Sequence, residues 1–117
     1  MLEAKEEMRR EPERAAAVAP AFPFERTLII VPAYNEAGRV GAVVADVRAS
    51  VPDADLLVVD DGSSDDTAAE ARSAGASVLS LPVNLGYGAA LQTGYKYAVR
   101  RDYGYVGQLD GDGQHLA

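Results

Sequence analysis

The chain has 117 residues, of which 48% are hydrophobic and 25% charged, and its formal net charge is −7. This length fits one small domain, and the composition is that of a globular chain and not of a disordered one. Eighteen Asp and Glu against eleven Lys and Arg argue against a duplex nucleic-acid binder, and the absence of cysteine excludes disulfides, thiolate metal sites and a cysteine nucleophile.

The first 26 residues differ in composition from the rest. Five Glu and four Lys or Arg crowd residues 3–14, and an Ala- and Pro-rich stretch follows up to Phe24. We therefore expect residues 1–26 to form a flexible charged leader. The segment is too acidic, and its apolar part too short, for a signal peptide. The chain also has no run of about 18 apolar residues that would form a transmembrane segment.

From Thr27 onward, short apolar runs alternate with helical patterns. Residues 27–31 form a continuous run that is rich in β-branched residues, which predicts a strand buried on both faces. Valines then recur at helical spacing and predict an amphipathic helix carrying Val40, Val43, Val44 and Val47. A second buried strand is predicted over 55–59.

The same alternation continues to the end of the chain. A helix is predicted to begin at the signal formed by Ser63 and Asp66, and to end near Ala74 with Gly75 as its cap. The remaining predicted elements are a third strand, a third helix and a fourth strand, over 76–81, 88–101 and 103–109.

Leu91, Tyr95 and Ala98 share one face of the third predicted helix, so we expect Tyr95 in the core. Strands that alternate with helices indicate a parallel sheet with right-handed crossovers. The sequence thus predicts an α/β fold, a Rossmann-like parallel sheet of about four strands with flanking helices.

Acidic residues gather where the predicted strands end. Seven of the twelve that follow Arg26 occupy these positions: Glu36, Asp60, Asp61, Asp65, Asp66, Asp110 and Asp112. Ligands of open parallel sheets bind at the carboxyl ends of the strands. Clustered carboxylates repel one another unless a cation or hydrogen-bond donors compensate, so we expect a functional site at this edge. We expect Asp65 and Asp66 to act only as acidic residues at the start of a helix, where they interact favourably with the helix dipole.

The last strand is followed by Asp110-Gly-Asp112. Two carboxylates on a glycine-rich turn can face one hard cation such as Mg²⁺ or Mn²⁺, and Gln114 could add a carbonyl oxygen. The alternative is an Asp-Gly turn that uses its side chains for local hydrogen bonds. The segment lacks the spacing of a calcium loop. His115 is the single histidine, which excludes multi-histidine metal sites, and we interpret it as a bystander and not as a catalyst.

Two other strand ends suggest contacts to a nucleotide. Asp60 and Asp61 could accept hydrogen bonds from ribose hydroxyls or from a base, and Tyr34 could pack against either. The glycine loop over 84–90 opens a helix and could present amides to phosphate. The dinucleotide fingerprint and the P-loop lysine are both absent, which argues against hydride transfer and P-loop chemistry. A receiver-like signalling domain is disfavoured because no phosphoacceptor Asp follows the third predicted strand.

Four motifs resemble, in order and spacing, the donor-binding half of family 2 glycosyltransferases. They are VPAYNE at 31–36, VDDGSSDDT at 59–67, NLGYGAA at 84–90 and QLDGDGQH at 108–115. Each falls at the end of a predicted strand, and together they cover residues 27–115. The resemblance is greatest to the branch that includes dolichol-phosphate mannose synthases and polyprenol-phosphate glycosyltransferases.

This resemblance implies a GT-A fold that binds a nucleotide-diphospho-sugar. The residues implied to bind the donor are Pro32, Tyr34, Glu36, Asp60, Asp61, Gly86 and Asp110. Among them Asp61 would contact the base, with Asp60 nearby. Asp110, Asp112 and Gln114 would hold Mg²⁺ or Mn²⁺. Tyr87 stands where this branch often has a basic residue, so the loop lacks a side-chain cation for the phosphates.

The resemblance further implies inverting transfer from a UDP- or GDP-sugar to a polyprenyl phosphate. The enzyme would be cytoplasmic and would act at the inner face of the membrane, with peripheral contact and no nucleic-acid partner. Residues 27–117 would form a truncated, nucleotide-sugar-binding half-domain, with the acceptor half and any catalytic base expected beyond Ala117. The alternative is a non-catalytic nucleotide-binding fragment, or a degenerate paralogue without the acceptor half.

Overall fold

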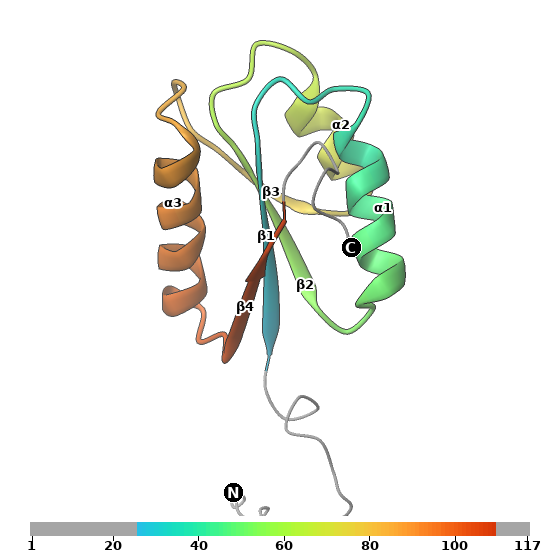
Figure 1. Cartoon of the computed structure of the whole chain (residues 1–117), viewed down its shortest axis with the longest axis vertical. Coiled ribbons are helices and arrows are strands. Elements are labelled where there is room, and N and C mark those ends of the chain that lie inside the picture. The colour runs from blue at the N-terminus through green and yellow to red at the C-terminus, as the bar shows by residue number, and fades with distance from the viewer. Residues whose placement is uncertain (1–25, 110–117) are drawn as a thin grey trace, which may run out of the picture.

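The computed structural model describes residues 26–109, so the leader predicted over 1–26 lies outside the described residues except for Arg26 (Figure 1). Strands and helices alternate throughout this part of the chain. In order they are β1 (Thr27–Ala33), α1 (Val40–Ser50), β2 (Asp55–Asp60), α2 (Thr67–Ser73), β3 (Ser77–Ser80), α3 (Tyr87–Arg100) and β4 (Tyr105–Gln108). Among these helices, none has both the length and the apolar character needed to cross a bilayer.

The four strands form one parallel sheet in the order β3-β2-β1-β4. The register sets Val31 opposite Val58 and Ala33 opposite Asp60. Helices α1 and α2 cover one face of the sheet and α3 covers the other (Figure 1). The predicted α/β fold with a parallel sheet is confirmed.

Each face of the sheet has its own apolar core, because successive side chains of a strand point to opposite faces. On one face, the four buried valines of α1 pack with Val31 and Val58. On the other face, Ala90 and Ala98 of α3 pack with Ile30 and Val59. The helical spacing of the valines in the sequence therefore identified the buried face of α1.

Helix α3 lies unusually close to β1 because of a glycine. A Cβ atom on Gly94 would stand 2.7 Å from Cγ2 of Ile30, too close for any side chain. The buried face of α3 consists of Ala90, Gly94 and Ala98. The expectation that Tyr95 lies in the core is wrong: 41% of this residue is exposed, because the small residues take the face that meets the sheet.

Strand β1 runs two residues further than predicted and includes Pro32. A proline lacks the N–H that a central strand needs. The last pair between β1 and β4 is Ile30 with Gln108, and the Leu109 N–H donates to the Ile30 carbonyl at 3.0 Å. Pro32 follows this pair on the same side of the strand, where β4 has already ended, so no strand-to-strand hydrogen bond is lost.

Helix α2 begins at Thr67, and not at the predicted Ser63 signal. Asp66 occupies the N-cap position, and no hydrogen bond from its side chain caps the helix. Asp65 instead accepts a hydrogen bond from the Thr67 N–H at 3.0 Å. At the other end, Gly75 adopts a φ of 108° and closes the helix as predicted.

Candidate functional site

The loops that follow β1, β2 and β3 gather at the carboxyl edge of the sheet, at the top of Figure 1. These loops carry most of the acidic residues that the sequence places at strand ends. Hydrogen bonds join each loop to the next, so the edge is one assembly and not three separate turns.

Asn35 links the first loop to the second. Its backbone N–H donates to the Ser63 hydroxyl at 2.9 Å, and its side-chain oxygen accepts from the Ser64 N–H at 2.9 Å. Asn35 has a φ of 52°, in the left-handed region that asparagine tolerates better than most residues. The Asn35 side chain therefore binds the backbone of the neighbouring loop.

Thr67 and Asp65 extend this link. The buried Thr67 hydroxyl accepts from the Glu36 N–H at 2.8 Å and donates to Asp65 in a short hydrogen bond. Asp65 also accepts from the Ala37 N–H at 3.2 Å. The hydrogen bond from Thr67 is the main cause that lowers the pKa of Asp65. As expected, Asp65 serves a helix start, but it also holds the preceding loop.

Glu70 of α2 caps the beginning of α1. Its two carboxylate oxygens accept from the N–H groups of Gly38 and Gly41, each at 2.7 Å. These two bonds lower the pKa of Glu70. No side chain caps α1 from its own N-cap position at Arg39. A carboxylate at this end also interacts favourably with the helix dipole.

Asp61 organises the loop between β3 and α3. Only 3% of this residue is exposed. One carboxylate oxygen accepts from the Leu85 N–H at 2.8 Å, and the other accepts from the Gly86 N–H at 2.9 Å and the Asn84 side-chain amide at 3.0 Å. A carboxylate has about four acceptor positions, so Asp61 retains about one for a ligand.

Gly62 lets the loop lie directly on the turn after β2. A Cβ atom on Gly62 would stand 2.4 Å from the carbonyl carbon of Val83, and the φ of Gly62 is 74°. Both the space and the backbone conformation require glycine here. The close approach brings Asn84 within reach of Asp61.

Asp60 keeps more of its acceptor capacity than Asp61. It is 5% exposed, and its two oxygens accept from the Ser63 N–H at 3.0 Å and from the Ser80 hydroxyl at 3.2 Å. Asp60 therefore accepts two of these hydrogen bonds where Asp61 accepts three, which leaves Asp60 more acceptor positions for a nucleotide.

The structure places Pro32, Tyr34, Glu36 and Gly86, the other predicted donor-binding residues among residues 26–109, at the same edge in different environments. Pro32 is buried within β1, and Tyr34 is 47% exposed just beyond it. Glu36 forms an ion pair with Arg39 at 2.7 Å. Gly86 adopts a φ of 104° immediately before α3.

The predicted metal ligands Asp110, Asp112 and Gln114 lie outside the described residues. Leu109, the residue before them, is bonded to β1 at the carboxyl edge. Within residues 26–109, no group of three or more acidic or histidine side chains is placed to hold a metal ion.

Several residues that shape this edge were not singled out from the sequence. Asn84 lies inside a motif that the sequence marked only for its glycines. Thr67 and Glu70 carried no signal of their own, because their partners are backbone N–H groups about 30 residues away. Such partners become visible only once the order of the strands is known.

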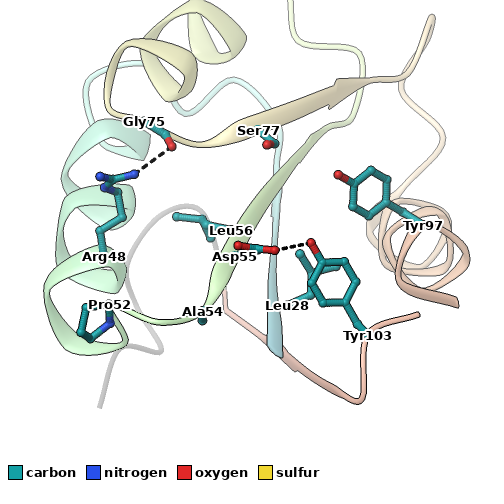
Figure 2. A pocket seen from close by; sticks show the side chains of 10 residues that line it. All are labelled: Leu28, Arg48, Pro52, Ala54, Asp55, Leu56, Gly75, Ser77, Tyr97 and Tyr103. Carbon is teal, nitrogen blue, oxygen red and sulfur yellow. Dashed lines mark hydrogen bonds between the residues drawn. The ribbon is translucent and has the colours of Figure 1, made fainter. Parts of the chain in front are cut away.

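A hollow of about 420 Å³ lies at the opposite, amino edge of the sheet (Figure 2). Two hydrogen bonds join polar groups of its lining. The Tyr103 hydroxyl donates to Asp55 at 2.5 Å, and Arg48 donates to the Gly75 carbonyl at 3.0 Å. Burial and then the bond to Asp55 raise the pKa of Tyr103 to about 12.

Two arginines and two tyrosines pack together beside this hollow. The Arg26 guanidinium lies 4.2 Å from the centre of the Tyr103 ring, and that of Arg101 lies 4.7 Å from the Tyr97 ring. The two rings are stacked with their centres 6.5 Å apart. Arg26 also pairs with Asp55 at 3.2 Å. This stack joins the start of β1 to the end of α3, so we interpret it as structural.

In a comparison with known protein families, the model of glycosyl transferase family 2 matches residues 28–117. The polyprenol monophosphomannose synthase of Mycolicibacterium smegmatis is 36% identical over 113 residues, which cover 90% of this chain and 43% of that protein. The undecaprenyl-phosphate mannosyltransferase of Micrococcus luteus is 36% identical over 95 residues, covering 77% and 39%. The chain thus spans less than half the length of these curated relatives.

Solved structures agree with the fold. Glucosyl-3-phosphoglycerate synthase of Mycobacterium tuberculosis superposes with a TM-score of 0.65 at 30% identity, covering 79% of this chain and 36% of that one. A complex of the same enzyme with Mn²⁺, UDP and glucosyl-3-phosphoglycerate superposes with a TM-score of 0.62 at 28% identity, covering 74% and 33%.

Proposed function

The chain belongs to glycosyl transferase family 2, and from this premise we propose that it forms the donor-binding part of an inverting glycosyltransferase that uses a UDP- or GDP-sugar. The observation that carries the proposal is the interlocked carboxyl edge. There, two nearly buried carboxylates and a glycine loop meet at the side of the sheet where the Asp110-Gly-Asp112 motif follows β4.

The nucleoside would bind between the ends of β1 and β2. Tyr34 offers an exposed ring for a base or a ribose, and Asp60 and Asp61 offer acceptors for their N–H or O–H groups. Pro32 and Glu36 would complete this pocket from the first loop. The acceptor positions that remain unused on Asp60 and Asp61 support this assignment, because each carboxylate would bind a ligand without losing its structural hydrogen bonds.

The diphosphate would lie toward the loop that begins α3. Tyr87 gives this loop no side-chain cation, so its contribution would come from backbone N–H groups in the first turn of the helix. The Gly86 N–H is already engaged by Asp61. Asp61 would therefore set the position of the loop as well as contact the base.

A divalent cation would compensate the charge of the diphosphate. Asp110, Asp112 and Gln114 present the oxygen ligands that Mg²⁺ and Mn²⁺ prefer, so this donor set fits such an ion. When bound, the ion stabilises the negative charge of the departing nucleoside diphosphate. The Mn²⁺ and UDP held by the mycobacterial structure support the assignment.

The acceptor would be a polyprenyl phosphate, as the names of the two curated relatives suggest. The transfer would take place at the cytoplasmic face of the membrane. A phosphate oxygen would attack the anomeric carbon from the side opposite the leaving group. The new bond to the sugar would form as the bond to the nucleoside diphosphate breaks, with inversion. Because a lipid phosphate is already anionic, the attack requires no proton removal. Acceptor contacts would belong to the part of the relatives that this chain does not span.

Incubation with a UDP- or GDP-sugar, Mn²⁺ and a polyprenyl phosphate tests this function. Formation of a lipid-linked sugar supports a transferase. Metal-dependent nucleotide binding without product would favour the alternative of a non-catalytic nucleotide-binding fragment or a degenerate paralogue.

A further inference from the structure

Charge is divided unequally between the two faces of the sheet. From Arg26 to Glu70 the chain has nine acidic and three basic residues, most of them in loops and at strand ends, and α1 and α2 each contain one acidic and one basic residue. From Ala71 to Arg101 it has four basic residues and no acidic one. The second segment includes α3, which lies on the face opposite α1 and α2 (Figure 1). An otherwise acidic protein therefore has one face that is neutral to basic.

Exposed apolar side chains gather on the same face. Of the eight large hydrophobic residues that are exposed among residues 26–109, five belong to α3 or to the loop that precedes it: Val83, Leu85, Tyr87, Tyr95 and Val99. Val99 is the most exposed of them, at 75%. We call α3 together with the loop that precedes it, residues 83–100, the α3 face.

Helical geometry brings the two kinds of side chain together on α3. Tyr95 and Val99 are one turn apart on α3. Lys96 and Arg100, which follow them in the sequence, are also one turn apart. All four are exposed. The outer side of α3 thus presents an apolar strip beside a basic strip, although an outward-facing side chain gains nothing from being apolar in water.

The loop before α3 continues this surface to the donor edge. Val83 and Leu85 are 57% and 58% exposed, although the backbone of the loop is fixed by Asp61 and Gly62. A rigid loop that presents apolar side chains avoids the entropy cost of ordering them on contact.

We propose that the α3 face docks on the anionic headgroup surface of a lipid bilayer. Basic residues attract such a surface, and Tyr, Val and Leu side chains enter the boundary between headgroups and acyl chains. The choice of a bilayer as the partner rests on the proposed function, in which the acceptor is a lipid phosphate. Docking in this way sets the donor edge beside the membrane.

Flotation of the whole 117-residue chain with vesicles tests the proposal. Vesicles of 30% phosphatidylglycerol in phosphatidylcholine are compared with pure phosphatidylcholine, at low salt and at 0.5 M NaCl. We expect the chain to float with the anionic vesicles at low salt. We expect less to float at high salt, which screens charge, and with neutral vesicles.

Two pairs of variants isolate the α3 face. Arg100→Glu and Arg72→Glu change net charge equally, and each arginine lies in the last turn of its helix, one on α3 and one on α2. We expect Arg100→Glu to weaken vesicle binding roughly tenfold or more, and Arg72→Glu to leave it within about twofold. Val99→Ser should likewise weaken binding, whereas Val51→Ser at the end of α1 should not.

Three results would overturn the proposal. The first is a wild-type chain that does not float with anionic vesicles. The second is equal weakening of vesicle binding by both members of a pair. The third is a dimer in sedimentation equilibrium that Val99→Ser dissociates, since the α3 face would then be covered by a second copy. Nucleotide titration in the absence of vesicles is independent of all three, so the docking proposal and the proposed function can fail separately.

Discussion

The Asp61 carboxylate and the Asn84 side-chain amide are 3.0 Å apart and join the end of β2 to the loop before α3. Asn84 also donates to the Asp61 carbonyl at 3.2 Å. One asparagine therefore bridges the backbone and the side chain of the residue expected to contact the base. The position of the loop before α3 and the position of the Asp61 carboxylate therefore depend on each other.

Asn84→Ala should weaken the binding of UDP more than that of uridine, because the variant loosens the loop beside the diphosphate while Asp60 and Tyr34 remain. It should also lower the free energy of unfolding by about 1–3 kcal/mol, since Asp61 loses a donor. Calorimetric titration with both ligands and urea unfolding measure these effects. Equal weakening for the two ligands would contradict this prediction, because the loss would then lie in the nucleoside contacts that the two ligands share.

Gly62→Ala and Gly86→Ala form a matched pair, because both glycines have positive φ. An alanine at 86 meets open space and should cost only the backbone strain of a φ of 104° and a ψ of 162°, about 1–3 kcal/mol. An alanine at 62 also meets the Val83 backbone and should cost about 1–3 kcal/mol more. Urea unfolding compares the two variants, and equal losses would mean that the loop does not pack closely on Gly62.

Much of the architecture could be predicted from periodicity. The four valines of α1 were correctly placed in the core, and the strand–helix alternation led to the parallel sheet. Tyr95 was misplaced because a helical pattern does not reveal that Gly94 must fill the contact with Ile30. The start of α2 was misplaced because Ser63 bonds to Asn35, a contact that requires the first two strands to be neighbours.

The candidate site was predictable in location but not in its internal bonding. The motif residues that the structure describes do lie at the carboxyl edge, as strand ends must in a parallel sheet. That Asp61 would bond to three donors of a distant loop could not be inferred, because backbone N–H groups have no sequence signature. The roles of Asp110, Asp112 and Gln114 stay predictions.

Glu70→Gln should flatten the acid dependence of stability. Hydrogen bonds from Gly38 and Gly41 lower the pKa of Glu70 in the folded state. The stabilisation is therefore complete above about pH 4.3, the ordinary glutamate pKa, and is lost as pH falls through the lower folded value. Urea midpoints from pH 7 down to pH 3 measure this loss. Asp46→Asn, at an exposed position on α1, is the control and should retain the wild-type slope.

Tyr103→Phe should alter the alkaline end of the stability profile. Burial, and then the bond to Asp55, raise the pKa of Tyr103 to about 12. The folded state favours the neutral phenol, so its contribution is present below about pH 10 and is lost as pH rises toward 12. The variant should lose about 1 kcal/mol of unfolding free energy at pH 7 and unfold with a weaker dependence on alkaline pH. Thermal unfolding from pH 7 to pH 11 shows both, and an unchanged alkaline slope would contradict the assignment.

Calorimetric titration of the folded chain with UDP and with GDP, in the presence and absence of Mn²⁺, tests the donor site most directly. We expect one of the two nucleotides to bind at least tenfold more tightly with Mn²⁺ than without it. We expect Asp112→Asn to remove this gain, and Asp46→Asn to keep it. Absence of nucleotide binding in a folded sample, or binding that Mn²⁺ does not change, would contradict the account.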